Sequence, residues 1–519
     1  MMNYRKEMKQ IQNSAYMETS THAAGPFCSQ PGRKVIFRTG FVKSAFRLAV
    51  FSLIFFTLPL SIQGRTADDS ILSGIQIPGL NFTPPPVDSR NLSPYATLYR
   101  LHNDTLPVVR LRIVIEGGED LESIDDAGNL DALAALLQTS GAGKLSAEQM
   151  ADRLALLGAS IGTSVSNQTW EISLSAMKED FPEALELLIL LLTEPNFDQS
   201  SLDTVQNQMI SSIRSRTDAP DTVGFLKLNS VMFPDTRRGY AMQESDVGKI
   251  SLDTVKKTLQ NRLKSARYHI ALDGDFQGLG IEKKLVDMLR KLPVPSQPLT
   301  VLPDNGFKAP EGKNQYRGKI VHVTGDYSQS LLIVASPTIA HNANDFYTMQ
   351  LGNHILGGGS FTSRLMQEIR VKRGLAYYAY SFNRSGAADG YLAAVSATRS
   401  DRAAETLSLM LQMIEGMKKN VDASDVAQAR TAILNSLVFL YDNPSEILAD
   451  HIRFEIDHMP PDYLNQFPEK IKAVTPADIK KAFQSYLDRD DLYIVVVGPE
   501  SLTAELRNIA PVIRMEASP

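Results

Sequence analysis

The chain of 519 residues contains a long internal repeat, and this repeat constrains its fold more than any other feature. Residues 251–275 align without gaps on residues 475–499. Residues 154–158 likewise fall opposite residues 370–374. Identical residues in the first alignment include Lys256/Lys480, Lys257/Lys481, Gln260/Gln484, Leu263/Leu487 and Gly274/Gly498. Such self-similarity indicates an internal duplication, so we predict two copies of one unit of roughly 200 residues or slightly more.

Each copy mixes strand patterns with helical ones. A run from Val109 to Ile115 alternates apolar and polar residues, as a half-buried strand does. Helical text follows in NLDALAALLQTS and SAEQMADRLALLGAS, then a strand pair in IGTSVSNQTWEISLSAM, and apolar helices at 181–192 and 202–216. This order predicts an α+β fold. We expect two homologous α/β-roll halves, each a mixed, mainly antiparallel sheet with helices packed on it, closing on each other like a clam.

The N-terminal region has the pattern of an export signal. An apolar run from Leu48 to Ile62 follows the basic residues Arg33, Lys34, Arg38, Lys43 and Arg47. The run is short for a membrane-spanning helix, although an uncleaved inner-membrane anchor stays an alternative. The sole cysteine, Cys28, falls in this leader, so the remainder has no thiol chemistry, which suits a periplasmic or otherwise exported protein.

Composition shifts suggest the domain boundaries. Proline-rich text at 65–90 indicates a connecting arm, and the Pro/Gly-rich segment 293–315 indicates a linker. The predicted units are a signal peptide or anchor at 1–64, the arm at 65–90, a first domain at 91–292, the linker at 293–315 and a second domain at 316–519.

The charge balance argues against nucleic acid as a partner. Of the 53 basic and 58 acidic residues, eight and two lie in residues 1–64, which leaves the remainder near −11. An acidic chain of this kind has no basic stripe to neutralise phosphates.

Residues 352–382 contain the most informative local pattern. Gly357, Gly358 and Gly359 permit backbone angles closed to other residues and close approach of another chain. Ser363 is a candidate N-cap for a following helix, and Gly374 has the position of its left-handed C′ residue.

The strand after Gly374 alternates, with Tyr378, Tyr380 and Phe382 on one face and Tyr377 on the other. A reversal at Gly374 brings Tyr377 back beside Arg370. Together these two side chains present N–H and O–H donors that can converge on a carbonyl or carboxylate oxygen. The alternative is that Arg370 is a solvated helix residue and Tyr377 simply packs.

This string resembles the C-terminal half of the insulinase/pitrilysin-type (inverzincin) zinc peptidases, a family that includes the mitochondrial processing peptidase subunits. The matching elements are Gly-Gly-Gly, Ser-Arg-Leu, Ile-Arg and Gly-Leu-Ala-Tyr, and the resemblance extends over most of the chain from about residue 88. It implies that Arg370 and Tyr377 grip a substrate backbone near the scissile carbonyl. Residues Gly357, Gly358, Gly359 and Ser360 are then expected to bind the substrate with them.

The resemblance also implies where zinc chemistry belongs, and there the sequence departs from the family. Inverzincins carry His-x-x-Glu-His on a helix of the first half, with both His on one face and the Glu as general base. The matching helix here has Asp131 and Ala135 at the two His positions and Ala134 at the Glu. The helix expected to supply the third ligand has no Glu or Asp between Asp203 and Asp218. We therefore expect no metal on this chain.

Other histidines give weaker patterns. His451, Glu455 and His458 share a helical spacing that can bind metal, but a charged surface face is the more economical interpretation. His322 and His341 have no partner at ligand spacing, and His354 is expected to line the glycine loop.

These observations lead to three hypotheses. The first is a non-catalytic, substrate-binding subunit of a two-component zinc metallopeptidase, inactive alone. In that hypothesis a homologous partner contributes the zinc, the two chains form a heterodimer, and Arg370 and Tyr377 act in trans on a peptide substrate. The second is a structural or polypeptide-binding protein with no role in proteolysis. The third is a self-sufficient peptidase with an unrecognised metal site.

Overall fold

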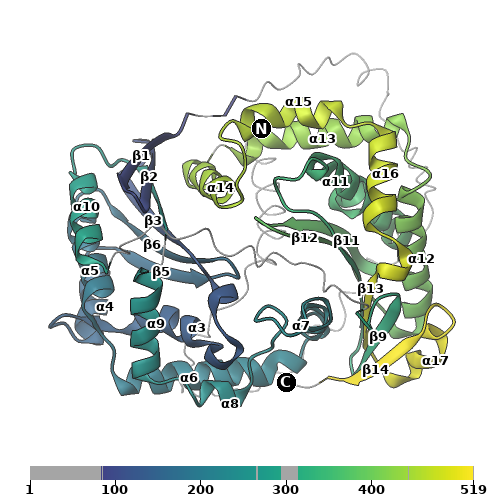
Figure 1. Cartoon of the computed structure of the whole chain (residues 1–519), viewed down its shortest axis with the longest axis horizontal. Helices are drawn as coiled ribbons and strands as arrows, with labels where there is room; N and C mark the ends of the chain where they lie inside the picture. Colours follow the sequence, from purple (N-terminus) through teal and green to yellow (C-terminus); the bar gives the residue numbers. More distant parts are fainter. Residues whose placement is uncertain (1–82, 85, 265–266, 294–313, 442, 518–519) are drawn as a thin grey trace, which may run out of the picture. The chain divides into compact units, whose positions relative to one another are not determined.

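The computed structural model describes residues 83–84, 86–264, 267–293, 314–441 and 443–517. The predicted leader, most of the predicted arm and most of the predicted linker lie outside these ranges. Within them, the chain forms two six-stranded mixed sheets with helices packed on them (Figure 1). The predicted α+β fold class is confirmed.

The first sheet is built from residues 88–274. Its strand order is β1-β2-β8-β3-β6-β5, with β2 and β8 parallel and the other neighbours antiparallel. The strands are β1 (Asp88–Ser93), β2 (Ala96–His102), β3 (Val108–Glu116), β5 (Ser160–Val165), β6 (Thr169–Met177) and β8 (Tyr268–Gly274). Its helices are α3 (Asn129–Thr139), α4 (Ala147–Leu156), α5 (Phe181–Thr193), α6 (Gln199–Arg214), α9 (Leu252–Lys264) and α10 (Ile281–Lys291).

The second sheet is built from residues 319–516. Its order is β11-β12-β10-β13-β9-β14, with β13/β9 and β9/β14 parallel. The strands are β9 (Lys319–Thr324), β10 (Ser330–Pro337), β11 (Ala376–Ser385), β12 (Gly390–Thr398), β13 (Tyr493–Gly498) and β14 (Val512–Glu516). Its helices are α11 (Phe346–Asn353), α12 (Ala403–Met417), α13 (Ala423–Leu440), α15 (Tyr463–Ala473) and α16 (Pro476–Tyr486).

The two sheets repeat one topology, as the duplication predicts. The aligned segments 251–275 and 475–499 each form a helix followed by a central strand, α9–β8 in one half and α16–β13 in the other. Read from the opposite edge, five strands of the second sheet match the first in order, β2-β8-β3-β6-β5 against β9-β13-β10-β12-β11, while the edge strands β1 and β14 come from opposite ends of the chain. The edge pairs differ in direction, because β1 runs antiparallel to β2 whereas β14 runs parallel to β9.

Two further helices cross between the halves. Helix α7 (Pro220–Met232) follows α6 in sequence but packs on β10 and β13 of the second sheet (Figure 1). Its Gly224 lies so close that an added Cβ would stand 2.4 Å from a Leu331 methyl carbon. Helix α14 (Pro444–Ile456) in turn packs on β2, β3 and β8 of the first sheet, through Leu448 and Ile452. Each half therefore supplies the helix that covers the second face of the other half's sheet.

An ion-pair bridge also joins the halves. Arg238 donates from Nη2 to Asp120 Oδ2 at 2.7 Å and from Nη1 to Asp389 Oδ2 at 2.8 Å. Asp120 precedes α3, and Asp389 lies in the turn between β11 and β12. The Arg238 guanidinium also lies 4.9 Å from the centre of the Phe233 ring.

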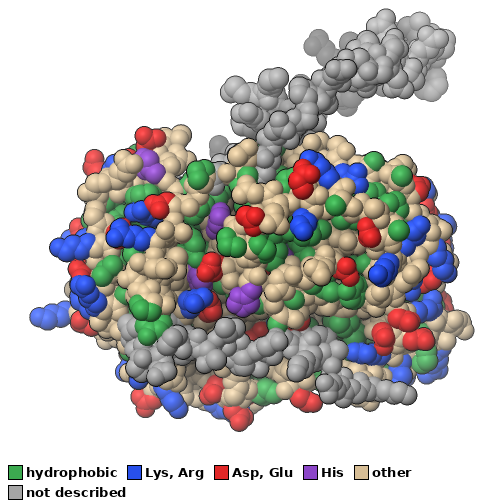
Figure 2. Space-filling view, turned by 45° about the horizontal axis from the view of Figure 1, so that its top comes forward, with side chains coloured by type: hydrophobic (Ala, Val, Ile, Leu, Met, Phe, Trp, Pro, Cys, Tyr) green, Lys and Arg blue, Asp and Glu red, His purple; other side chains and the backbone are tan. Residues whose placement is uncertain are grey.

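Charges are mixed on the surface. Figure 2 shows basic and acidic side chains interspersed over the visible face. Among the helices of the described ranges, none combines the length and apolar character that crossing a bilayer requires.

Candidate functional site

The glycine-rich loop connects two π-helical turns. Helix α11 continues into a π-helix, His354–Gly358, and a 3₁₀ turn, Ser360–Thr362, leads to a second π-helix, Met366–Val371. Such wide turns are rare and often occur at functional sites. His354 lines this loop as predicted, because an added Cβ on Gly359 would stand 3.0 Å from its ring.

The backbone angles predicted for the three glycines are not observed. None of Gly357, Gly358 and Gly359 is among the described residues with positive φ; that angle occurs instead at Ser360, with φ 52°. A Cβ on Gly357 would stand 2.2 Å from the backbone nitrogen of Ser381 in β11. The close approach that this glycine permits is therefore to the chain's own strand.

Arg370 lies in the last turn of the second π-helix. Gly374, with φ 62°, ends that turn as predicted. The Leu375 N–H donates to the Ile369 carbonyl at 2.9 Å and the Gly374 N–H to the Arg370 carbonyl at 3.0 Å. The Gly374 bond is that of the αL cap motif, which closes the helix end and fixes where Arg370 emerges.

Tyr377 is placed by a β-bulge. Ala376 pairs with Thr398 and Tyr378 with Ala397, so Tyr377 is an extra residue in β11. The prediction of unbroken alternation was wrong at this residue, although Tyr378, Tyr380 and Phe382 share a face as expected. Bulges re-aim side chains, and here Tyr377 is 76% exposed.

The structure adds a third residue, Phe361, which the sequence reasoning missed. The Arg370 guanidinium carbon lies 5.2 Å from the centre of the Phe361 ring and 5.3 Å from the centre of the Tyr377 ring. Both distances are within the range of cation–π attraction. The available signal was a lone aromatic residue inside a Gly/Ser/Thr-rich loop.

The other cations near the loop are paired. Arg364 binds Asp425 at 2.7 Å, and Lys372 and Arg373 both bind Glu368. By contrast, the Arg370 guanidinium makes no ion pair or hydrogen bond with any residue in the described ranges. Two aromatic rings position it while its N–H groups stay available to a carbonyl or carboxylate oxygen.

The degenerate zinc positions lie on α3. Ala134 is buried, Asp131 and Ala135 are partly buried, and neither alanine can ligate a metal or move a proton. Burial raises the pKa of Asp131, and the nearby Glu122 carboxylate raises it further, against the opposing charges of Arg237 and Arg216. Asp131 thus lies in a mixed cluster of carboxylates and guanidinium groups.

Glu122 connects the carboxylate–guanidinium cluster around Asp131 to the start of helix α3. Its carboxylate accepts the Leu130 N–H at 2.7 Å and the Gly128 N–H at 3.3 Å, which satisfies free donors at the start of α3. Its Oε2 also pairs with Arg237 Nε at 3.3 Å. Glu122 and Arg237 are therefore engaged in stabilising the fold.

Comparison with known proteins places the site in a family. Residues 249–433, which include the whole glycine loop, Arg370 and Tyr377, match the family described as the peptidase M16 inactive domain. The match begins near the end of the first half and extends through the second half as far as α13. This confirms the resemblance to the insulinase/pitrilysin-type peptidases.

Relatives extend the likeness to most of the chain. The chain is 25% identical over 403 residues to the "Non-peptidase homolog YmxG" of Helicobacter pylori, which covers 76% of this chain and 90% of that protein. It is 21% identical over 325 residues to an uncharacterized zinc protease of Streptomyces coelicolor, covering 62% of this chain and 70% of that protein. In fold it resembles the crystal structure of a peptidase M16 inactive domain from Pseudomonas fluorescens, with TM-score 0.70 and 23% identity over 80% of this chain and 98% of that one.

The histidine pattern on α14 does not form a cluster in the structure. Helix α14 ends at Ile456, and His458 has a left-handed backbone with φ 55°, so it leaves the face that carries His451 and Glu455. Burial lowers the pKa of His451. Within the described ranges, no three His, Cys, Asp or Glu side chains come together as a metal site.

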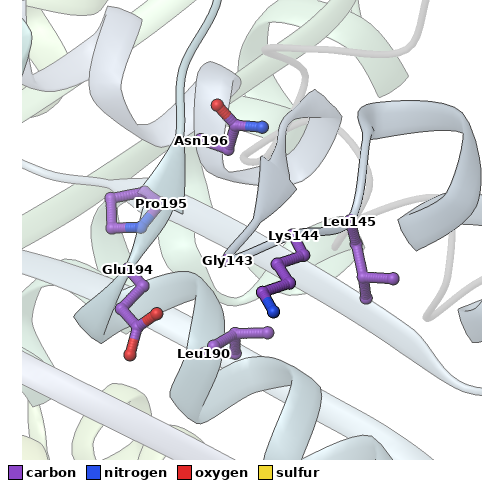
Figure 3. A pocket seen from close by; sticks show the side chains of 7 residues that line it. All are labelled: Gly143, Lys144, Leu145, Leu190, Glu194, Pro195 and Asn196. Carbon is purple, nitrogen blue, oxygen red and sulfur yellow. The ribbon is translucent and has the colours of Figure 1, made fainter.

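A surface depression lies elsewhere in the chain, outside the matched M16 residues. It is lined by Lys144 and Leu145 on one side and by Glu194, Pro195 and Asn196 on the other (Figure 3). The depression is shallow and open, and it contains none of the residues discussed above. We therefore place the candidate site at the glycine loop, on chemical grounds.

Proposed function

We propose that this chain is the non-catalytic, polypeptide-binding subunit of a two-component zinc metallopeptidase. The observation that carries the proposal is the state of Arg370, whose guanidinium is positioned by two aromatic rings and keeps its donors available. The loss of the zinc motif at Asp131, Ala134 and Ala135 supports the same division of labour. A homologous partner would supply the zinc, and a peptide or unfolded segment would be the substrate.

In this proposal Arg370 and Tyr377 act in trans on the substrate backbone. The half-buried Arg370 guanidinium donates to a peptide carbonyl oxygen near the partner's zinc, and the Tyr377 hydroxyl supplies a second donor. Such donors stabilise the negative charge that develops on the oxygen during peptide cleavage, and removal of one typically lowers the rate by about 10²–10³-fold. The exposed Gly358 and Ser360 would contact the substrate, while buried Gly357 would hold β11 close to the loop.

The test is co-expression with a chain that carries His-x-x-Glu-His and is encoded nearby. Arg370→Ala is expected to lower peptide cleavage by the pair by about a hundredfold. Arg373→Ala is the matched control, because Arg373 is three residues away and binds Glu368. Cleavage that is unchanged in Arg370→Ala would reject the trans role.

A second candidate is a polypeptide-binding or structural protein without any role in proteolysis. The name of the H. pylori relative, "Non-peptidase homolog YmxG", favours this second candidate, and the match covers 90% of that protein. It predicts a stable homodimer whose size is unchanged by a zinc-bearing chain, which light scattering measures with and without that chain. We also propose export to the periplasm, on the basis of the leader sequence, and cleavage of a signal peptide is checked by N-terminal sequencing of the mature protein.

A further inference from the structure

We propose that Phe361 is a specificity-determining residue, whose ring receives an apolar side chain of the bound peptide next to the backbone oxygen held by Arg370. The inference rests on the proposed polypeptide-binding function and names the substrate class: extended segments with an aromatic or large aliphatic side chain beside the gripped carbonyl. Three structural observations support it.

The first is the way in which Phe361 is presented. It lies in the middle of the 3₁₀ turn, which begins at Ser360 with its positive φ. Within this segment the Thr362 hydroxyl donates to the Gly359 carbonyl at 2.8 Å and the Ser363 hydroxyl to the Ser360 carbonyl at 2.7 Å. The Gln367 side-chain amide, from the following helix, donates to the carbonyl of Phe361 itself. A strained turn held by this many bonds fixes its middle residue, and such strain commonly occurs at ligand sites.

Ser363 takes part in this arrangement. It has the extended backbone of an N-cap, as predicted, but its hydroxyl points back into the turn. The turn is thus stabilised from both ends, while the Phe361 side chain between them stays 57% exposed. The ring is held in place and remains accessible.

The second observation is the chemistry around Arg370. Phe361 and Tyr377 cover the guanidinium with apolar rings, and Val371 beside it is exposed as well. A ligand whose oxygen meets the guanidinium edge therefore also meets apolar surface. A peptide presents such a combination, a backbone carbonyl with a side chain a few ångströms away. An inorganic anion would gain no favourable contact from the apolar rings.

The third observation comes from the duplicated half. The alignment of residues 154–158 with residues 370–374 places Leu145 opposite Phe361. Leu145 lies nine residues before Leu154, and Phe361 lies nine residues before Arg370. Leu145 is partly buried and packs against the first core. The same position thus serves core packing in one half and exposes an aromatic ring in the other, so the fold itself does not require an exposed Phe361.

The experiment measures peptide binding by the full chain without any partner. Fluorescence anisotropy is recorded with two labelled unstructured peptides of equal length and charge, one containing Phe and Leu and the other Ser and Asn in their place. Phe361→Ala is expected to weaken binding of the apolar peptide about tenfold and to leave the polar peptide unchanged, while Phe361→Leu recovers part of the loss. Phe439→Ala, which removes a 63% exposed ring on α13, is the control and should change neither affinity.

The outcomes separate the two proposals. If the unsubstituted chain binds neither peptide, the proposed function fails and this inference fails with it. If the chain binds both but Phe361→Ala weakens them equally or not at all, the specificity role is overturned while polypeptide binding stands. The melting temperature of each variant shows whether an equal loss comes from unfolding.

Discussion

The two halves use the same structural position in different ways. In the first half, the regular helix α4 ends at Leu156, two residues before Gly158, and β5 pairs with β6 without a break in register. In the second half, the corresponding turn is a π-helix that ends at Val371, three residues before Gly374, and β11 has a bulge at Tyr377. Both glycines have similar positive φ, 54° and 62°. The shared scaffold therefore folds without the π-turn and the bulge, and these irregularities belong to the candidate site.

At helix α3, where the resemblance implies the family's zinc motif, the candidate chemistry is absent from the first half. Helix α3 of the first half carries Asp131, Ala134 and Ala135 where the resemblance implies a zinc motif, and ion pairs of the buried Arg237 lie near it. The second half thus has irregular elements that leave side chains exposed, whereas the contacts around α3 in the first half stabilise the fold.

The largest expected effect is that of Gly357→Ala. The new methyl group would lie 2.2 Å from the Ser381 nitrogen, so loop or strand must shift, at a cost of about 2–3 kcal/mol. Gly141 is the counterpart of Gly357 in the first half, because each lies 13 residues before the aligned Leu154 or Arg370. A Cβ on Gly141 would lie 2.1 Å from the Leu145 carbonyl oxygen. Both alanine variants should melt at lower temperature by circular dichroism, but only Gly357→Ala should lose peptide binding when assayed well below its melting point. Equal binding by both would remove the contrast.

Next is Arg238→Ala, which removes the ion pairs with Asp120 and Asp389. Hydrogen bonds to charged groups contribute about 1.5–3 kcal/mol each at most, so a loss of roughly 1–3 kcal/mol is expected. Arg290→Ala is the control, because the exposed Arg290–Asp287 pair contributes less than about 1 kcal/mol. Thermal unfolding measures both, and equal stability of the two variants would show that the bridge does not hold the halves together.

A smaller effect is expected from Gly158→Ala and Gly374→Ala. No atom lies within 4 Å of a Cβ built on either glycine, so the change is conformational only, about 1–2 kcal/mol in each. The two stability losses should match. Peptide affinity should fall only for Gly374→Ala, because this turn sets the spacing of Arg370 and Tyr377. A fall for Gly158→Ala would place peptide contacts in the first half too.

The smallest effect concerns pH. Burial lowers the pKa of His354, so the folded chain resists a proton that the unfolded chain accepts near pH 6.5. The contribution of His354 to stability is therefore complete above that pH and is lost as the pH falls toward the lowered value, by at most about 1.4 kcal/mol per pH unit. Gln138 is the counterpart of His354 in the first half, because each lies 16 residues before the aligned Leu154 or Arg370. His354→Gln should flatten the decline in melting temperature between pH 7 and 5, and an unaltered slope would exclude this residue as its source.

The sequence predicted the features that depend on periodicity. The duplication, the alternating strand face of Tyr378, Tyr380 and Phe382 and the left-handed Gly374 follow from spacing and residue type, and the structure confirms them. The bulge at Tyr377 was missed because one extra residue leaves the local hydrophobic pattern unchanged. Phe361 was missed because its position depends on a hydrogen-bonded turn, which periodicity does not reveal.

The crossing of α7 and α14 could not be predicted for a related reason. An apolar helix face shows that a helix is buried, but not against which sheet. Both helices follow elements of their own half in sequence, so short connections favour the wrong assignment. The carboxylate–guanidinium cluster near Asp131 was likewise hidden, because Glu122 and Arg237 are far apart in the chain.

The exchange of helices has a consequence for synthesis on the ribosome. Strand β8 completes the first sheet at Gly274, but α14 begins only at Pro444. At about 5–20 residues per second, the helix is made on the order of ten to thirty seconds after the sheet it covers. During that interval the nascent chain presents Tyr99, Val114 and Ala271 without their eventual cover, which makes a holdase chaperone a useful companion and a truncated first half a poor candidate for independent expression.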